Sequence, residues 1–181
     1  MQSFPSQIVV KYYSKRAVRR TCSRRTAYYT EQMDMIYVDK KVVQQIKATI
    51  CTQSMESGGI LGFKDGVISA FYEDKNADVS YGSYQPDIVS CEKVINDEWS
   101  KSDVSFCGFV HTHRADMNPS ETDILYYRAI LESMRDIGYD QAVYLFIADC
   151  KAQEDNLLYA YIGRYNEQNR FFTCPVTIIV K

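Results

Sequence analysis

The stretch that decides the fold is Cys107-Gly-Phe-Val-His-Thr-His-Arg-Ala-Asp-Met-Asn-Pro-Ser-Glu-Thr-Asp123. It contains the only two histidines of the 181-residue sequence, His111 and His113, which lie two positions apart. A β-strand directs residues i and i+2 to the same side, so an extended segment here aims both imidazoles at one point. Asp123 follows ten residues after His113, in a Ser-Glu-Thr-Asp run that is typical of the first turn of a helix. Two imidazoles and one carboxylate are the ligand set of a catalytic zinc, with a fourth position left for water.

Simpler interpretations exist for each part of this stretch. Ser120-x-x-Asp123 before an apolar run is also a helix-capping box. A His-x-His pair taken alone could be a surface coincidence. The combination is less common than either part, because the chain has no other histidine and places both next to a carboxylate that opens a helix. We therefore predict a Zn²⁺ site formed by His111, His113 and Asp123.

The composition indicates one globular domain of ordinary size. Hydrophobic residues make up 46% of the chain and aromatic residues 13%, which is too apolar for a disordered protein. No stretch approaches the roughly 18 to 20 apolar residues that a transmembrane helix needs. Lys11, Lys15 and Arg16 interrupt any secretory signal early. We expect a cytoplasmic protein that does not bind a membrane.

The six cysteines support this expectation. The closest two, Cys91 and Cys107, are 16 positions apart, so the chain has no Cys-x-x-Cys pair for zinc or redox chemistry. Reduced, structural thiols are predicted. Cys107 lies four residues before His111 and is an alternative thiol ligand, but it would share the face of the histidines only deeper in the strand.

Residues 1–30 form a basic arm ahead of the domain, which we place at residues 31–181. The arm holds seven lysines and arginines and no acid, and the rest of the chain holds 14 bases against 23 acids, a net charge of −9. Such an arm can bind nucleic acid, an acidic partner or the acidic body of its own domain. We favour an arm folded onto the domain with its charges solvated.

Hydrophobic periodicity predicts the order of elements. Asp65-Gly66 between two apolar runs indicates a β-hairpin, and Asp39 is a suitable helix N-cap. Strands are expected at 33–38, 58–64, 67–72, 104–113, 142–148, 157–165 and 171–180, helices at 39–50, 91–99 and 120–138, and loops at 74–87 and 114–119. This mixed order predicts a single α/β or α+β domain, with one mixed β-sheet flanked by helices.

Glu56 is our candidate general base. It opens the run Glu56-Ser-Gly-Gly-Ile-Leu-Gly62, in which the glycines allow a close approach of the backbone at the start of a strand. A carboxylate beside a zinc site can take a proton from the attacking water and pass it to the leaving amine. Without the histidines, Glu56 would be only a surface acid before a strand.

Together these residues resemble a known family. Glu56-x-Gly-Gly-x-Leu-x-Gly, His111-Thr-His113 and Pro119-Ser-x-x-Asp123 are similar to the motifs of the JAB/MPN (JAMM) zinc metalloproteases, in particular the prokaryotic-type JAB isopeptidases. The resemblance covers roughly residues 33–150. It implies a cytidine-deaminase-like JAB/MPN fold with zinc at the edge of a mixed sheet. It also implies that His111, His113 and Asp123 are ligands, that Glu56 is the acid/base, and that Ser120 hydrogen-bonds the oxyanion or the water.

The same resemblance implies hydrolysis of peptide or isopeptide bonds, often after the C-terminal tail of a ubiquitin-like protein. The chain departs from the family pattern in two ways. Six residues separate His113 from Ser120 where seven are common, and Arg114 replaces a proline. We expect the shorter spacing to leave the ligands intact and Arg114 to be solvated.

Other functions remain as alternatives. The basic arm, with tyrosines among its bases, could make this a nucleic-acid-associated protein of the same fold, although the acidic body argues against it. An inactive interaction module would bind no metal. A Cys–His protease built on Cys107 and His111 is also possible, but the metal site accounts better for both histidines. The sequence contains no Gly-x-Ser-x-Gly elbow, phosphate-binding loop or dinucleotide-binding fingerprint.

Overall fold

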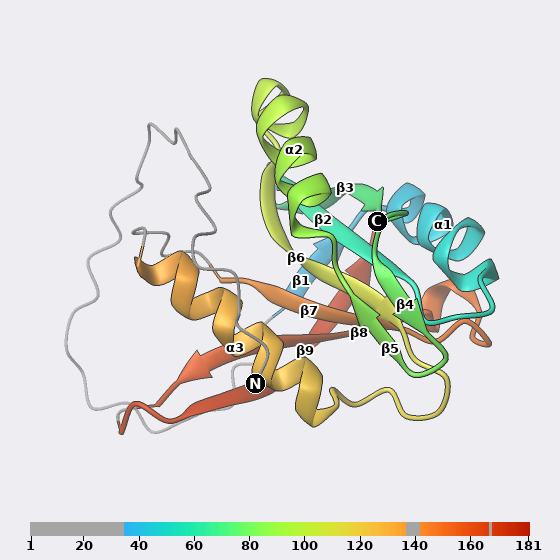
Figure 1. The fold of residues 1–181 in the computed structure, drawn as a ribbon. Helices are drawn as coiled ribbons and strands as arrows, with labels where there is room; N and C mark the ends of the chain where they lie inside the picture. Colours follow the sequence, from blue (N-terminus) through green and yellow to red (C-terminus); the bar gives the residue numbers. More distant parts are fainter. Residues whose placement is uncertain (1–34, 137–141, 167) are drawn as a thin grey trace.

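A computed structural model describes residues 35–136, 142–166 and 168–181 (Figure 1). The predicted basic arm, Cys22 and the helix end expected at Gly138 lie outside the described residues. The bounds of the strands are β1 Met35–Val38, β2 Gly58–Lys64, β3 Val67–Glu73, β4 Asp78–Ser80, β5 Ser83–Gln85, β6 Ser105–Thr112, β7 Tyr144–Ala148, β8 Leu158–Tyr165 and β9 Phe171–Val180. The helices are α1 Lys40–Ala48, α2 Ile88–Asp97 and α3 Glu121–Asp136, with short 3₁₀ turns η1 Ile50–Thr52, η2 Trp99–Ser102 and η3 Glu154–Asn156.

The molecule is built around one mixed β-sheet, as predicted, and this sheet closes into a barrel. The strand order is β1-β3-β2-β6-β7-β8-β9, and β1 pairs in parallel with both β3 and β9. The β6–β7 pair is parallel, while β2–β6 and β7–β8 are antiparallel. The motif strand β6 therefore lies inside the sheet with a neighbour on each side. The prediction of a mixed α+β fold with flanking helices is confirmed.

The two sides of the sheet pack against different helices. One core cluster contains Val42, Val43 and Ile46 of α1 together with inward residues such as Val110 and Phe146. The other joins side chains of α2 and α3 to the opposite side of β2, β6 and β7, as their alternation requires. His111 follows Phe109 by two residues and shares this second side. The sheet thus presents the first histidine to the side covered by α3.

Local sequence signals explain most element boundaries. The Asp65-Gly66 turn has positive φ angles of 50° and 84°, as a two-residue hairpin loop requires. The Asp39 side chain accepts a hydrogen bond from the Lys41 amide at 2.8 Å and caps α1, as predicted. Asp87 caps α2 in the same way, by accepting from Val89, so α2 starts three residues earlier than we expected.

The prediction of a loop at 74–87 is wrong in part. Residues 78–85 form a small separate hairpin of β4 and β5, which lies in front of the later part of β6 in Figure 1. A two-residue connection, Tyr81-Gly82, joins the strands. The strands are three residues long and mostly exposed, so they lack the apolar alternation by which we identified the other strands.

Among the described residues, no helix combines the length and the apolar character needed to cross a membrane.

Candidate metal centre

The structure brings His111, His113 and Asp123 together. His111 lies near the end of β6, His113 follows that strand by one residue, and Asp123 lies in the first turn of α3. The two Nε2 atoms are 2.8 Å apart. Asp123 Oδ1 lies 3.4 Å from Nε2 of His111, and Oδ2 lies 3.2 Å from Nε2 of His113. One potential ligand atom of each residue therefore faces the same point, and all lie within 4.8 Å of one another.

These separations suit a zinc ion. In a tetrahedral site with bonds of about 2.0–2.1 Å, neighbouring ligand atoms lie about 3.3 Å apart. The Nε2–Nε2 distance of 2.8 Å is somewhat shorter than that edge, and the distances of 3.4 and 3.2 Å reach the two different oxygens of the Asp123 carboxylate. Imidazole nitrogen and carboxylate oxygen are both ligands that zinc accepts. The donor set and its spacing thus fit the predicted cation.

The orientation of His113 favours metal binding. Its Nδ1 lies 2.6 Å from the backbone carbonyl oxygen of Asp116, which can only accept a hydrogen bond. Nδ1 must therefore carry the proton, and in the neutral ring Nε2 keeps its lone pair free for a cation. A backbone partner on the remote nitrogen is the usual arrangement of a metal-binding histidine.

The charges of the centre are coupled. Burial acts to raise the pKa of Asp123, but hydrogen bonds from His111 and His113 outweigh it and hold the pKa well below its usual range. Burial acts to lower the pKa of His113, but the Asp123 carboxylate and the Asp116 carbonyl raise it on balance. In the protein without a metal, a proton on His113 can therefore supply positive charge beside the Asp123 carboxylate.

Asp123 also takes part in the capping box. The Ser120 amide donates to Asp123 Oδ2 at 2.8 Å, and the Asp123 amide donates to Ser120 Oγ at 3.1 Å. The two interpretations of this motif are therefore compatible, because the same box that begins α3 fixes the carboxylate toward the histidines. The Ser120 hydroxyl accepts in this box and keeps its own proton for another partner.

Glu56 lies beside the three residues. It precedes β2, is half-buried, and its amide donates to the Ser80 carbonyl at 3.0 Å. Burial raises the pKa of Glu56 above its usual value, while the charges of His113 and His111 oppose that rise. The carboxyl group is thus within electrostatic reach of both histidines, and its raised pKa makes it a better proton acceptor.

Arg114 is exposed but is not simply solvated, which corrects our expectation. Its guanidinium donates to the carbonyls of Gln53 (3.3 Å) and Ser54, and lies 5.0 Å from the ring centre of Tyr81. These contacts tie the loop after β6 to the segment before Glu56 and to the tip of the β4–β5 hairpin. Arginine has five donors in a planar group and can join three segments where the proline of the family pattern could not.

Two residues of the site were missed in the sequence. The Tyr84 ring stacks on His111 with centroids 5.8 Å apart and 16° between planes. Its hydroxyl donates to the buried Asp74 at 3.4 Å, and the Asp87 amide donates to the same carboxylate oxygen at 2.7 Å. The Tyr81-Gly82 turn was the one signal for this hairpin.

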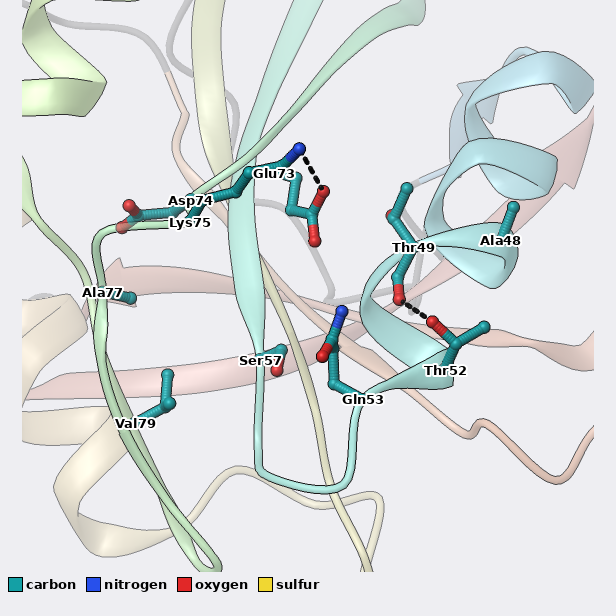
Figure 2. Close-up of a pocket in the computed structure, with 10 residues that line it drawn as sticks. All are labelled: Ala48, Thr49, Thr52, Gln53, Ser57, Glu73, Asp74, Lys75, Ala77 and Val79. Atoms are coloured by element: carbon teal, nitrogen blue, oxygen red, sulfur yellow. Dashed lines mark hydrogen bonds and ion pairs between the residues drawn. The ribbon is translucent and has the colours of Figure 1, made fainter.

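Cys107, the alternative thiol ligand, and the nearby carboxylate Glu73 both lie outside this centre. Cys107 is buried in the core, where its thiol donates to the Leu61 carbonyl at 3.3 Å, so it does not join the centre. Glu73, another carboxylate near the proposed elements, forms an ion pair with Lys75 at 3.7 Å. This pair lines a separate polar pocket between η1 and the segment after β3 (Figure 2). The pocket has a volume of about 500 Å³, and its lining includes none of the three candidate ligands.

Comparisons with known proteins support the fold. No protein-family model matches the chain, and no curated protein matches it. The solution structure of protein DSY2949 from Desulfitobacterium hafniense superposes with a TM-score of 0.58 at 20% identity, over 81% of this chain and 93% of that one. AF2198 from Archaeoglobus fulgidus, described as a JAB1/MPN domain protein, gives a TM-score of 0.43 at 14% identity, over 80% and 98% of the two chains. At these identities, the likeness to DSY2949 establishes a shared fold and leaves the chemistry to be argued from the residues of the site.

Proposed function

We propose that this protein is a zinc-dependent peptidase or isopeptidase of the JAB/MPN (JAMM) type. The observation that carries the proposal is the convergence of His111, His113 and Asp123 on one point, with Glu56 beside them. The inactive-module alternative gives no reason for three ligand atoms and a carboxylate of raised pKa to meet. The motifs Glu56-x-Gly-Gly and Ser120-x-x-Asp123, which resemble those of the family, lie around the same centre.

The residues divide the chemistry among them. His111, His113 and Asp123 would hold the zinc, which as a Lewis acid polarises the scissile carbonyl and lowers the pKa of a water. Glu56 accepts the proton of the attacking water and delivers it to the departing amine, so that one carboxyl group acts first as base and then as acid. Ser120 donates its free hydroxyl proton to the oxygen on which negative charge develops.

The substrate we propose is an extended chain, such as the C-terminal tail of a ubiquitin-like protein. β5 of the hairpin pairs only with β4 in the described part of the sheet, so its outer edge offers unpaired backbone groups next to His111. An extended peptide can add to such an edge as a further strand. That pairing would hold the scissile bond close to the three ligands.

Cleavage assays on the full chain test this function. A ubiquitin-like protein with a C-terminal reporter and a library of extended peptides are incubated with the zinc-loaded protein, with and without a chelator. We expect cleavage that the chelator abolishes and added zinc restores. Asp123→Asn should lose activity, while Glu121→Gln, which neutralises an exposed carboxylate in the same first turn of α3, should keep it. Cleavage that survives Asp123→Asn would contradict the proposal.

A further inference from the structure

A pocket of about 350 Å³ adjoins the candidate metal centre. It lies between the β4–β5 hairpin and α3, and its lining continues onto His111 and Asp123. Its position is next to the point where a scissile bond would lie. The pocket is distinct from the polar pocket of Figure 2, because the two share no lining residue.

The walls of this pocket are mainly apolar. They are formed by Tyr84, Phe109, Leu125, Tyr126, Ile130 and Leu145. Phe109 and Tyr126 meet edge to face with ring centroids 6.3 Å apart, which gives the pocket a rigid aromatic side. Leu125 is 67% exposed although it is a large aliphatic side chain, so it offers apolar surface at the opening that nothing in the described part of the chain covers.

Among the described residues, Asp78 and Asp123 are the acidic side chains of the lining. Asp123 faces the histidines, and Asp78 is exposed on β4. No lysine or arginine of the described part of the chain lines the pocket. Burial raises the pKa of Tyr126, so its phenol stays neutral. An acidic side chain between these apolar walls would find no lysine or arginine and would lose its hydration, whereas an apolar one would remove wall atoms from water.

The volume fits a large side chain. A cavity of roughly 150 Å³ lined by Leu, Ile and Phe is enough to hold benzene. The pocket here exceeds that size at 350 Å³ and has room for a phenyl or isobutyl group together with the backbone that carries it. A glycine at the same place would leave the apolar walls in contact with water.

We propose that this pocket binds a large apolar or aromatic side chain of an extended peptide and so selects the residue that adjoins the scissile bond. The inference rests on the proposed function for the position of that bond, but the binding itself does not require cleavage. It narrows the substrates to chains with Leu, Met, Phe, Tyr or Trp on one side of the cleaved bond.

The first experiment reads the preference from the products. A peptide library, randomised at the positions around the cut, is digested with the zinc-loaded full chain, and mass spectrometry identifies the residues on both sides of each cleaved bond. We expect large apolar residues to be favoured about ten- to a hundred-fold over glycine and aspartate on one side of the bond. Cleavage with equal rates for all residues, or with a preference for glycine or acidic residues, would overturn the pocket assignment and leave the proposed function standing.

A variant pair then locates the preference. Leu125→Arg places a cation at the opening, so it should lower the preference for phenylalanine and raise the relative rate for aspartate, each by about tenfold. Val89→Arg is the matched control, because Val89 is also a helix residue, is 77% exposed and does not line the pocket. A Leu125→Arg protein with unchanged preferences would place the selectivity outside this pocket.

Binding without cleavage separates the two proposals. Blocked Gly-Xaa-Gly tripeptides, with Xaa as Phe, Leu, Gly or Asp, are titrated into the zinc-loaded protein, and the methyl NMR signals of Leu125 and Ile130 are followed. We expect the Phe and Leu peptides to shift these signals at about tenfold lower concentration than the Gly and Asp peptides. If no peptide is cleaved but this order holds, the function fails and the pocket stands. If the four peptides behave alike, the pocket assignment is wrong whatever the outcome of the cleavage assay.

Discussion

At the scale of single residues, Glu56 has the most demanding role. Glu56→Gln has nearly the same shape, so the fold and the zinc content should be kept. The amide cannot accept the proton from the attacking water, so turnover should fall by about 10²- to 10⁴-fold. Zinc content, peptide affinity and cleavage are measured on one preparation. Retained cleavage would point to another carboxylate such as Glu121, and lost zinc would make Glu56 a ligand.

Ser120 is predicted to matter more for rate than for stability. Its Oγ accepts a hydrogen bond from the Asp123 amide, and the loss of such a helix cap lowers the free energy of unfolding by about 1 kcal/mol. Loss of a donor to the developing oxyanion costs roughly a hundred-fold or more in rate. Ser120→Ala should therefore reduce kcat far more than it lowers the melting temperature. A destabilised variant of normal activity would leave only the capping role.

Some residues of the centre were predictable because their signals are local. The two-residue period of a strand is enough to bring His111 and His113 to one side, and the Ser120-x-x-Asp123 box begins a helix wherever it occurs. Tyr84 and Asp74 carry no such signal. They meet His111 and Asp87 through the tertiary position of the hairpin, which the sequence pattern does not specify.

At the scale of elements, the β4–β5 hairpin positions the first histidine. Gly58 at the start of β2 makes room for it, since a Cβ there would lie 2.7 Å from the Tyr84 ring. Tyr84→Ala removes the stacked ring and should weaken zinc affinity or activity by about 10- to 100-fold. Tyr84→Phe keeps the ring and loses only the 3.4 Å bond to Asp74, so it should behave much like the wild type. Equal losses in both variants would show that the hydroxyl, not the stacking, matters.

The elements predicted well are those with a long apolar pattern. α1 buries Val42, Val43 and Ile46 at helical spacing, and β2 and β7 each bury a continuous apolar run, so their hydrophobic patterns identify them. β4 and β5 are three residues long and mostly polar, and their pairing depends on a short turn and on contacts such as the Glu56–Ser80 hydrogen bond. The hydrophobic pattern of the sequence does not predict such contacts.

At the scale of the whole molecule, closure of the sheet was not predictable. Strand β1 pairs in parallel with β3 and with β9, which are separated by about a hundred residues of sequence. The apolar pattern of β1 shows that it is buried but does not name its neighbours. The mixed sheet itself was predictable, because strands and helices alternate irregularly along the chain.

The stability of the metal-free protein should depend on pH through the His113–Asp123 pair. The pKa of His113 is raised in the folded state. Its contribution to the free energy of unfolding is therefore complete below about pH 6.5, the pKa of an unfolded histidine, and is lost as the pH rises through the pKa of the folded state. The pKa of Asp123 is lowered in the folded state. Its contribution to the free energy of unfolding is therefore present above about pH 3.9, the pKa of an unfolded aspartate, and is lost only as the pH falls through the pKa of the folded state. The chelated protein should therefore melt at a lower temperature at pH 8 than at pH 6.

Two controls make this measurement specific. Asp123→Asn removes the carboxylate that raises the pKa of His113, so the chelated variant should show a much smaller difference between pH 6 and pH 8. Zinc competes with protons for the histidines, so added zinc should raise the melting temperature more at pH 8 than at pH 6. An identical pH dependence in wild type and Asp123→Asn would rule out this pair as its source.

The central claim is a zinc ion held by His111, His113 and Asp123, and the metal content of the purified full chain tests it most directly. Elemental analysis after zinc loading and removal of free metal should give one equivalent per chain for the wild type. It should give close to none for His113→Ala, with the fold confirmed by circular dichroism. A wild-type protein without zinc, or a folded His113→Ala protein that keeps a full equivalent, would contradict the claim.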